Sequence, residues 1–312
     1  MRIVITEFMD EAAVASLARQ FDVRYDAKLV DRRDDLAAAL ADADALIVRN
    51  RTQVDAALLA RAPQLRVVGR LGVGLDNIDV AACAARGIEV IPATGANALA
   101  VAEYVVCTTM LLLRGAYQSS AAVAAGKWPR AALSEGREIA GKTLGVVGFG
   151  GIGRLVVKLA QGLGMKAIVT DPAIAADAPV WRASGVAYRG LDDLLAESDA
   201  VTLHVPLVPE TRHLLSAGRM ARMKRGAVLI NTARGGVIDE AALAEALAGG
   251  HLAGAALDVF ETEPLPAGSP LAGAPNLVLT PHIAGVTRES NVRVSTLIAA
   301  KVAQALTACE KT

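Results

Sequence analysis

Residues 143–172 decide the fold, and they read TLGVVGFGGIGRLVVKLAQGLGMKAIVTDP. The apolar run over 143–147 predicts a buried strand, the spacing from Ile152 onward predicts a helix, and the run over 167–170 predicts a second strand. Continuous apolar strands joined by a helix are typical of a parallel sheet that is covered on both faces. The stretch therefore predicts a β-α-β unit within an α/β domain.

Three glycines in this stretch have the spacing G-x-G-x-x-G, and they fall where the first strand ends and the helix begins. Gly148 allows the chain to turn, Gly150 allows the backbone to approach a pyrophosphate, and Gly153 allows the helix to pack closely on the sheet. The first N–H groups of the helix and its positive dipole end then face the phosphates. An ordinary tight turn also uses glycine, but the strand and the helix on either side favour a dinucleotide site.

An acidic residue, Asp171, ends the second strand, 18 residues after Gly153. A carboxylate here can accept hydrogen bonds from the adenosine ribose, and it would repel a 2′-phosphate, so NAD is favoured over NADP. Taken alone, Asp171 could be a solvated acid before Pro172. Methyltransferases can use the same fold, but the second half of this chain gives that alternative no support.

The rest of the chain continues to alternate between strands and helices. We expect further strands over residues 2–6, 45–49, 66–70, 89–91, 200–203, 227–231, 254–257 and 277–280. We expect helices near 10–21 and 54–62, a long helical segment over 98–126, and a last helix over 286–308 that returns to the amino-terminal part. The sequence therefore predicts two doubly wound parallel-sheet domains, one formed by residues 1–97 plus 286–312 and the other by residues 98–285.

Composition limits the partners and the compartment. Acidic and basic residues balance at 32 each, so no general attraction to nucleic acid or to an anionic membrane is expected. The longest apolar run, 105–113, is too short to cross a bilayer. Cys83, Cys107 and Cys309 lack the paired spacing of zinc or redox sites, which indicates reduced thiols and no metal. With no secretory pattern at the start, we expect a cytoplasmic protein with a small-molecule partner.

Hydride transfer between NAD and a 2-keto acid needs a cationic anchor, a proton donor and an acid that holds the donor. Arg234 follows the strand at 227–231, and His282 follows the strand at 277–280. Glu263 lies just beyond a third strand, where its carboxylate could hold the imidazole, although Glu261 is a rival on the same grounds. Each of these residues could also be structural or solvated. Among the other histidines, His204 stands at a strand end and is expected to line the nucleotide site.

Six segments together resemble the D-2-hydroxyacid dehydrogenase family, and they are similar to its phosphoglycerate and sulfolactate members. They cover nearly the whole chain in the family's order: GRLGVGLDNID (69–79), VVGFGGIG (146–153), LHVPLVPET (203–211), NTARGGVID (231–239), ALDVFETEP (256–264) and TPHIAG (280–285). The resemblance implies a flavodoxin-like substrate domain and a Rossmann NAD-binding domain, with a cleft that closes over the ligand. It also implies a homodimer formed through the nucleotide domain.

The resemblance also assigns roles to individual residues. It implies that Arg234 binds the substrate carboxylate, that His282 is the acid/base, and that Glu263 rather than Glu261 pairs with it. Beyond the three glycines of the turn, the residues expected to contact the nucleotide are Gly151, Ile152, Asp171, His204, Val205, Pro206, Thr232, Ala233, Asp258 and Ala284.

Substrate choice depends on a second group of residues in the amino-terminal part. In the family, the loop at 71–75 offers backbone N–H groups to the substrate carboxylate, and Val73 and Gly74 hold those positions here. Arg49 and Arg51 follow a nearby strand and suggest a substrate with a second anionic end, such as sulfolactate or 3-phosphoglycerate, although both could simply face solvent. Two alternatives remain open: an NADH-sensing co-repressor of the same fold, and an enzyme that oxidises formate or phosphite.

Overall fold

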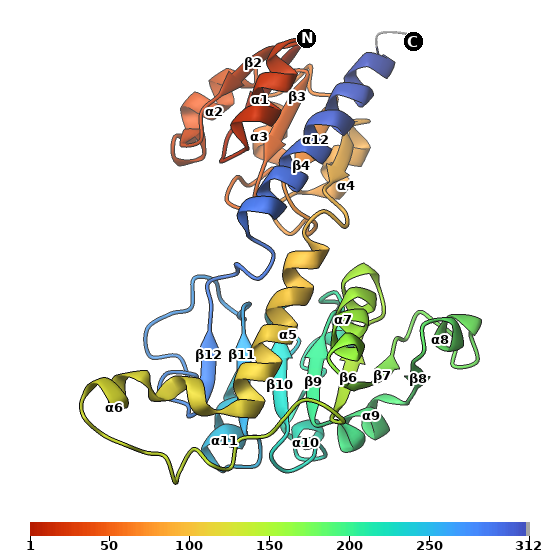
Figure 1. The fold of residues 1–312 in the computed structure, drawn as a ribbon. Helices are drawn as coiled ribbons and strands as arrows, with labels where there is room; N and C mark the ends of the chain where they lie inside the picture. The colour runs from red at the N-terminus through yellow and green to blue at the C-terminus, as the bar shows by residue number, and fades with distance from the viewer. Residues whose placement is uncertain (310–312) are drawn as a thin grey trace. The chain divides into compact units, whose positions relative to one another are not determined.

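The computed structural model describes residues 1–309, leaving out the side chains of Gln118 and Cys309. The chain forms two units (Figure 1): Met1–Asn97 together with the chain from Val286, and Ala98–Gly285. Each unit contains one sheet, and every strand pair in both sheets is parallel. The predicted fold class, two doubly wound parallel-sheet domains, is therefore confirmed.

The first unit has a five-stranded sheet in the order β2-β1-β3-β4-β5. Its strands are β1 (Arg2–Ile5), β2 (Asp22–Tyr25), β3 (Ala45–Val48), β4 (Val67–Arg70) and β5 (Glu89–Pro92). Its helices are α1 (Glu11–Ala18), η1 (Leu29–Asp31), α2 (Arg33–Ala39), α3 (Ala56–Ala60), α4 (Val80–Ala85) and α12 (Arg288–Cys309).

Helices cover both faces of this sheet. Alternate residues of a strand point to opposite faces, so Ile3 and Ile5 pack with α1 and α12, while Val4 packs with α2, α3 and α4. The helix α12 lies very close to β4, because a Cβ at Gly69 would come within 2.8 Å of the Val302 side chain. The last helix of the chain is thus built into the core of the first unit.

The second unit has a seven-stranded sheet in the order β12-β11-β10-β9-β6-β7-β8. Its strands are β6 (Thr143–Val147), β7 (Lys166–Thr170), β8 (Ala187–Tyr188), β9 (Ala200–Leu203), β10 (Val228–Asn231), β11 (Gly254–Leu257) and β12 (Leu277–Leu279). Its helices are α5 (Ala98–Arg114), η2 (Ala116–Ser119), α6 (Ser120–Ala124), α7 (Gly151–Gly162), α8 (Pro179–Ala183), α9 (Leu191–Glu197), η3 (Pro209–Thr211), α10 (Ala217–Met220) and α11 (Glu240–Ala248).

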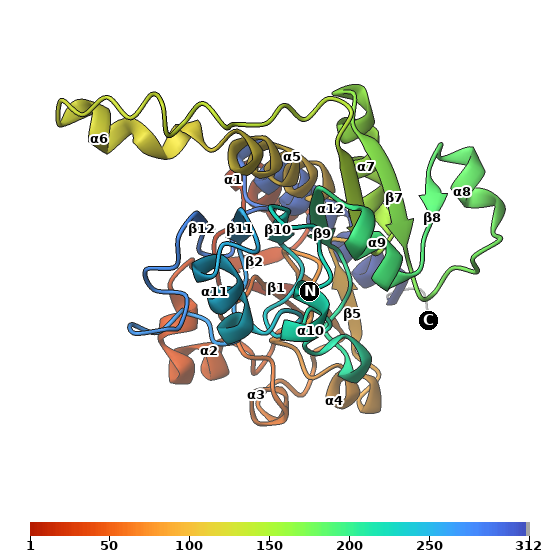
Figure 2. The same ribbon diagram turned by 90° about the horizontal axis from the view of Figure 1, so that it is seen from below.

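The helix expected over 98–126 is not continuous, which corrects the sequence-based prediction. Helix α5 ends at Arg114, because Gly115 adopts a left-handed conformation with φ of 69° that stops an α-helix. The chain then continues through η2 and α6 as an arm, which we define as residues 115–137. The arm extends away from the sheet of its own unit (Figure 2).

The sequence-based prediction missed two strands, β2 and β8. Strand β2 lies at the edge of the first sheet, and its residues alternate between exposed and half-buried, so it lacks an apolar run. Strand β8 has only two residues, again at a sheet edge.

Within residues 1–309, none of the helices is both long and apolar enough to cross a membrane. Cys83 is buried, Cys107 is exposed, and both are free thiols, whereas the side chain of Cys309 lies outside the described part.

Candidate functional site

The glycine turn connects β6 to α7 as the spacing predicts. Gly148 has a positive φ of 98°, and a Cβ there would come within 2.6 Å of the carbonyl oxygen of His204. At Gly153, a Cβ would lie 2.2 Å from the carbonyl oxygen of Gly148, so a side chain would push the helix off the turn. The turn therefore requires glycine at both positions for steric reasons.

The space in front of the turn suits a phosphate group. A Cβ built at Gly150 or Gly151 would meet nothing within 4 Å, so a ligand can approach the backbone there. Gly150 is the N-cap residue of α7 and has no side chain to cap the first N–H groups of the helix. Ile152 is half-buried in the first turn of the same helix. These features match what a pyrophosphate needs at a helix N-terminus.

A buried hydroxyl near the same sheet edge also fits a bound cofactor. Thr232 Oγ1 is buried and has no hydrogen-bond partner among the described residues. Thr232 follows β10, and Ala233 beside it is buried. Since buried hydroxyls in proteins are nearly always hydrogen-bonded, this atom is suited to a ligand that the chain itself does not supply. The residues present therefore fit a dinucleotide.

Asp171 lies directly after β7 and is half-buried. One oxygen of its carboxylate accepts a hydrogen bond from the Phe149 N–H at 2.7 Å, and the other accepts one from the Ala173 N–H at 2.9 Å. The carboxylate thus fixes the residue inside the glycine turn. Each carboxylate oxygen has a second lone pair, so both can still accept hydrogen bonds from a ribose.

The segment after β9 supplies His204, Val205 and Pro206. Burial lowers the pKa of His204 to about 4, so its imidazole is neutral near pH 7. Its Nε2 lies 3.0 Å from the Thr202 hydroxyl. Val205 is buried, whereas Pro206 is exposed. A neutral, partly apolar wall of this kind suits the lining of a nucleotide site better than proton transfer.

Arg234 lies in a loop that is fixed after β10. The Asn231 side chain brackets this loop, donating to the Arg234 carbonyl at 2.9 Å and accepting from the Ala233 N–H at 3.0 Å. Gly235 lies so close to the next loop that a Cβ there would fall 1.7 Å from the carbonyl oxygen of Phe260. Gly235 therefore brings the loop that carries Arg234 against the loop that carries Glu263.

His282 and Glu263 are in direct contact. His282 Nδ1 donates a hydrogen bond to Glu263 Oε2 at 2.8 Å, and Glu263 Oε1 accepts one from the Phe260 N–H at 3.1 Å. The other ring nitrogen of His282, Nε2, has no hydrogen-bond partner among the described residues. The imidazole is half-exposed, so a ligand can reach this second nitrogen. A histidine held by a carboxylate through Nδ1 is arranged to exchange a proton through Nε2.

Asp258 fixes the backbone around His282. Its buried carboxylate accepts the N–H groups of Ile283 and Ala284, both at 2.8 Å, and the Thr280 hydroxyl at 2.6 Å. The His282 N–H also bonds to the Asp258 carbonyl. Asp258 and Ala284 were expected as nucleotide contacts, but the Asp258 carboxylate faces the histidine loop. The sequence motif DVFETEP gave no sign of this second use.

Two further residues near this site, His213 and Glu240, were not singled out from the sequence. His213 Nε2 lies 3.1 Å from Glu261 Oε1, so Glu261 contacts His213 and not His282. Glu240 is buried, and its Oε1 accepts the Glu261 N–H at 2.7 Å. Burial raises the pKa of Glu240, and the charges of Glu261 and Glu263 add to that effect. A glutamate at a helix start is common, so the pattern alone could not reveal this contact.

These residues all follow neighbouring strands of one sheet. The glycine turn follows β6, and His204, Arg234, Glu263 and His282 lie beyond β9, β10, β11 and β12. Because the strands are parallel, their carboxyl ends lie along the same edge, where ligands of open α/β sheets bind. The second unit therefore collects every residue expected for catalysis and for the nucleotide.

The first unit holds the four residues expected at the substrate. Val73 and Gly74 lie in the loop after β4, and their backbone N–H groups have no hydrogen-bond partner among residues 1–309. Two donors of this kind can bind a carboxylate. Beside them, the Arg70 guanidinium packs over Gly72, because a Cβ at Gly72 would fall 1.3 Å from Arg70 Nη1.

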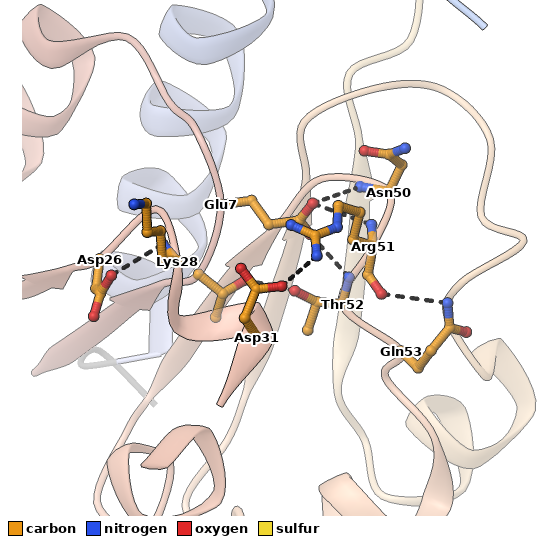
Figure 3. Close-up of polar contacts among 9 residues, drawn as sticks. Glu7, Asp26, Lys28, Asp31, Asn50, Arg51, Thr52 and Gln53 are labelled. Carbon is orange, nitrogen blue, oxygen red and sulfur yellow. Dashed lines mark hydrogen bonds and ion pairs between the residues drawn. The ribbon is translucent and has the colours of Figure 1, made fainter. Parts of the chain in front are cut away.

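The two arginines after β3 have different surroundings. Arg49 is half-buried, its Nη2 donates to Asn291 Oδ1 at 2.9 Å, and its guanidinium lies 5.7 Å from the centre of the Phe8 ring. Burial lowers the pKa of Arg49, and the charge of Glu7 opposes that shift. Arg51 is exposed and forms an ion pair with Asp31 (Figure 3). The sequence predicted the same substrate-binding role for both arginines, but the Arg51 guanidinium already pairs with the Asp31 carboxylate.

Comparison with known proteins gives consistent results. Residues 106–284 match the family model described as D-isomer specific 2-hydroxyacid dehydrogenase, NAD binding domain. The (S)-sulfolactate dehydrogenase of Chromohalobacter salexigens is 56% identical over 304 residues, which cover 97% of this chain and 98% of that protein. The D-3-phosphoglycerate dehydrogenase of Mycobacterium bovis is 42% identical over 97% of this chain, which spans only 56% of that protein. The crystal structure of the TT0316 protein from Thermus thermophilus is similar with a TM-score of 0.89 and 35% identity, over 99% of this chain and 97% of that one.

Proposed function

The chain belongs to the family of D-isomer specific 2-hydroxyacid dehydrogenases, and on that premise we propose that its substrate is a 2-hydroxy acid with a second anionic group, such as sulfolactate or 3-phosphoglycerate. The protein is an NAD-dependent oxidoreductase of 2-hydroxy acids and their keto forms. When NAD is bound, it supplies the hydride acceptor for oxidation at C2, and its reduced form supplies the donor for the reverse reaction. The residues of the chain must then bind the substrate, orient it and move one proton.

The contact between His282 and Glu263 is the observation that supports proton transfer at C2. During oxidation, Nε2 of His282 takes the proton of the C2 hydroxyl, and the resulting imidazolium is stabilised by the Glu263 carboxylate at Nδ1. During reduction, the same nitrogen returns a proton to the carbonyl oxygen. The half-exposed imidazole gives a substrate access to this nitrogen.

Arg234 is proposed to anchor the substrate carboxylate. A guanidinium can bind a carboxylate through two parallel hydrogen bonds, which sets the orientation of C2. The loop that holds Arg234 is fixed by Asn231 and packs against Phe260, so the arginine starts from a defined backbone. Such pre-organisation reduces the entropy lost when the substrate is oriented.

The cofactor and substrate roles are divided between the two units. We assign the Ala98–Gly285 unit to NAD, with contacts from the glycine turn, Asp171 and the segments after β9, β10 and β12. The remaining unit is the substrate domain, in which Val73 and Gly74 offer backbone N–H groups to the carboxylate and Arg49 binds the second anionic group. The sulfolactate and 3-phosphoglycerate named for the two relatives both carry a charged tail, and this supports the choice of substrate.

A homodimer is proposed from the arm at residues 115–137. On this arm Trp128 is 78% exposed, and Tyr117 and Val123 are also exposed. Large apolar side chains gathered on a projecting segment are typical of a protein interface.

We also assign the protein to the cytoplasm, which supplies NAD and keeps thiols such as Cys107 reduced.

A substrate panel tests the proposal. We would follow NADH absorbance with sulfolactate, 3-phosphoglycerate, lactate and glycerate, for the wild type and for the Arg49→Ala and Arg51→Ala variants. The proposal expects a higher kcat/KM for the doubly charged substrates and a loss of about tenfold or more in Arg49→Ala that is confined to them. Arg51→Ala should have a smaller effect, because its guanidinium pairs with Asp31. Equal losses on all four substrates would refute the second anionic group.

A further inference from the structure

Glu7 is a buried acid that the sequence did not single out. It lies two residues after β1 and is 4% exposed. Its Oε1 accepts the backbone N–H groups of Arg49 at 2.9 Å and Thr52 at 3.0 Å. Its Oε2 accepts those of Arg51 at 3.1 Å and Asn50 at 3.3 Å. The carboxylate therefore holds four consecutive N–H groups of one loop, and Figure 3 shows those of Asn50, Arg51 and Thr52.

This loop, residues 49–52, is an anion-binding cradle that the protein fills with its own carboxylate. Consecutive backbone N–H groups that point to one place form a site for a negative charge. Burial disfavours the charged form of Glu7, but the N–H donors of Thr52, Arg49 and Arg51 outweigh it and lower its pKa. The acid is therefore ionised at neutral pH, and it fixes the loop backbone through charge-assisted bonds.

Fixing the backbone also determines where the two arginine side chains go. Arg49 is directed to Asn291 and the Phe8 ring, whereas Arg51 is directed to Asp31 on η1. Thr52 adds a second attachment, since its hydroxyl lies 2.8 Å from that of Thr6. The loop thus presents one arginine in a half-buried setting and holds the other in an exposed ion pair.

We propose that Glu7 is a positioning residue for recognition of the second anionic group of the substrate. This inference rests on the proposed function, in which Arg49 binds that group. Glu7 does not touch the substrate, and it acts by keeping the Arg49 backbone in place. Its removal should therefore weaken binding of a charged tail much more than it changes the hydride-transfer step.

Kinetics of three variants test the proposal. Glu7→Gln has the same shape, but its amide nitrogen cannot accept an N–H group, so two of the four donors lose their acceptor. We expect its KM to rise about tenfold for 3-phosphoglycerate or sulfolactate, with little change for lactate or glycerate and with kcat within about threefold of wild type. Glu7→Asp keeps the carboxylate and should restore part of the affinity, and it also provides a readout if Glu7→Gln does not fold.

Asp10→Ala is the matched structural control. Asp10 caps α1 in the same unit by accepting the N–H groups of Ala12 and Ala13. Its side chain forms no bond with the loop at 49–52, so Asp10→Ala should lower the free energy of unfolding without disturbing that loop. Asp10→Ala should leave the KM values for singly charged and for doubly charged substrates unchanged. Equal KM increases on singly and doubly charged substrates in Glu7→Gln or Glu7→Asp would overturn the inference, and so would unchanged KM values. If instead Arg49→Ala loses kcat/KM equally on singly and doubly charged substrates, the proposed function is wrong whatever Glu7 does.

Discussion

At the scale of single residues, the proton-transfer pair depends on which glutamate contacts His282. Glu263 contacts it, while Glu261 contacts His213, so two similar acids two residues apart hold different histidines. Residue spacing could not separate them, because both lie in the same loop. The family resemblance favoured Glu263, and the distances agree with that choice, although the catalytic role itself stays a prediction.

Glu263→Gln is expected to reduce kcat about 100-fold, since the amide can still accept a hydrogen bond from Nδ1 but cannot balance the charge of the imidazolium. Stopped-flow NADH absorbance measures this loss. Glu261→Gln serves as the control and should stay within about threefold of wild type. Similar losses in both variants would contradict the assignment.

Asp171→Ala is expected to raise the KM for NAD about tenfold or more and to reduce the preference for NAD over NADP. The variant removes the acceptor for the ribose and also the bond that fixes Phe149 in the glycine turn. The matched control is Asp193→Ala, which removes an exposed acid from the first turn of α9 in the same unit. An unchanged ratio of kcat/KM for the two cofactors in Asp171→Ala would count against Asp171 as the selecting residue.

At the scale of elements, apolar runs predicted the central strands and the edge strands β5 and β12 well, but they missed the edge strands β2 and β8. Strands β6, β9 and β11 have the predicted ends, because they are buried on both faces and consist almost wholly of apolar residues. Strand β2 lacks such a run, since charged Asp22 and Arg24 face outward at the sheet edge. The break after α5 was also missed, because one glycine within an apolar helix pattern does not by itself predict a left-handed turn.

The loop at residues 49–52 gives the first unit a defined sensitivity to acid. The pKa of Glu7 is lowered in the folded state from its ordinary value of 4.5, so its contribution to stability is present above that value and is lost as pH falls through the folded pKa. We expect the urea midpoint of the wild type to decrease more between about pH 6 and about pH 3 than that of Glu7→Gln, which has no such proton to bind. Parallel decreases in both proteins would show that Glu7 does not contribute to acid sensitivity.

At the scale of the whole molecule, the family, the α/β fold class and the NAD cofactor are confirmed. They were predictable because the glycine turn and five further motifs occur in order between residues 69 and 285. The NADH-sensing alternative is not favoured, because the relatives found are dehydrogenases. The surroundings of Arg49 and Arg51 were not predictable, since Asn291 and Asp31 are far from both in sequence.

The proposed homodimer gives a prediction for the arm. Trp128→Ala should weaken self-association about 30-fold or more, because exposed tryptophans at the centre of an interface commonly contribute about 2 kcal/mol or more. Sedimentation velocity over a concentration series measures the change. Leu163→Ala, which removes another exposed apolar side chain of the same unit, is the control and should leave association unchanged. A wild-type protein that sediments as a monomer at every concentration would rule out the dimer.

The central claim is that His282 exchanges the proton of a 2-hydroxy acid whose hydride passes to NAD. Its most direct test is single-turnover NADH formation by the wild type and by His282→Gln, with saturating NAD and either sulfolactate or 3-phosphoglycerate. We predict that the wild type forms NADH with at least one of them. His282→Gln should be slower by about 100-fold or more while its NAD affinity, measured by fluorescence titration, is unchanged. A wild-type rate in His282→Gln, or no NADH from the wild type with either acid, would contradict the account.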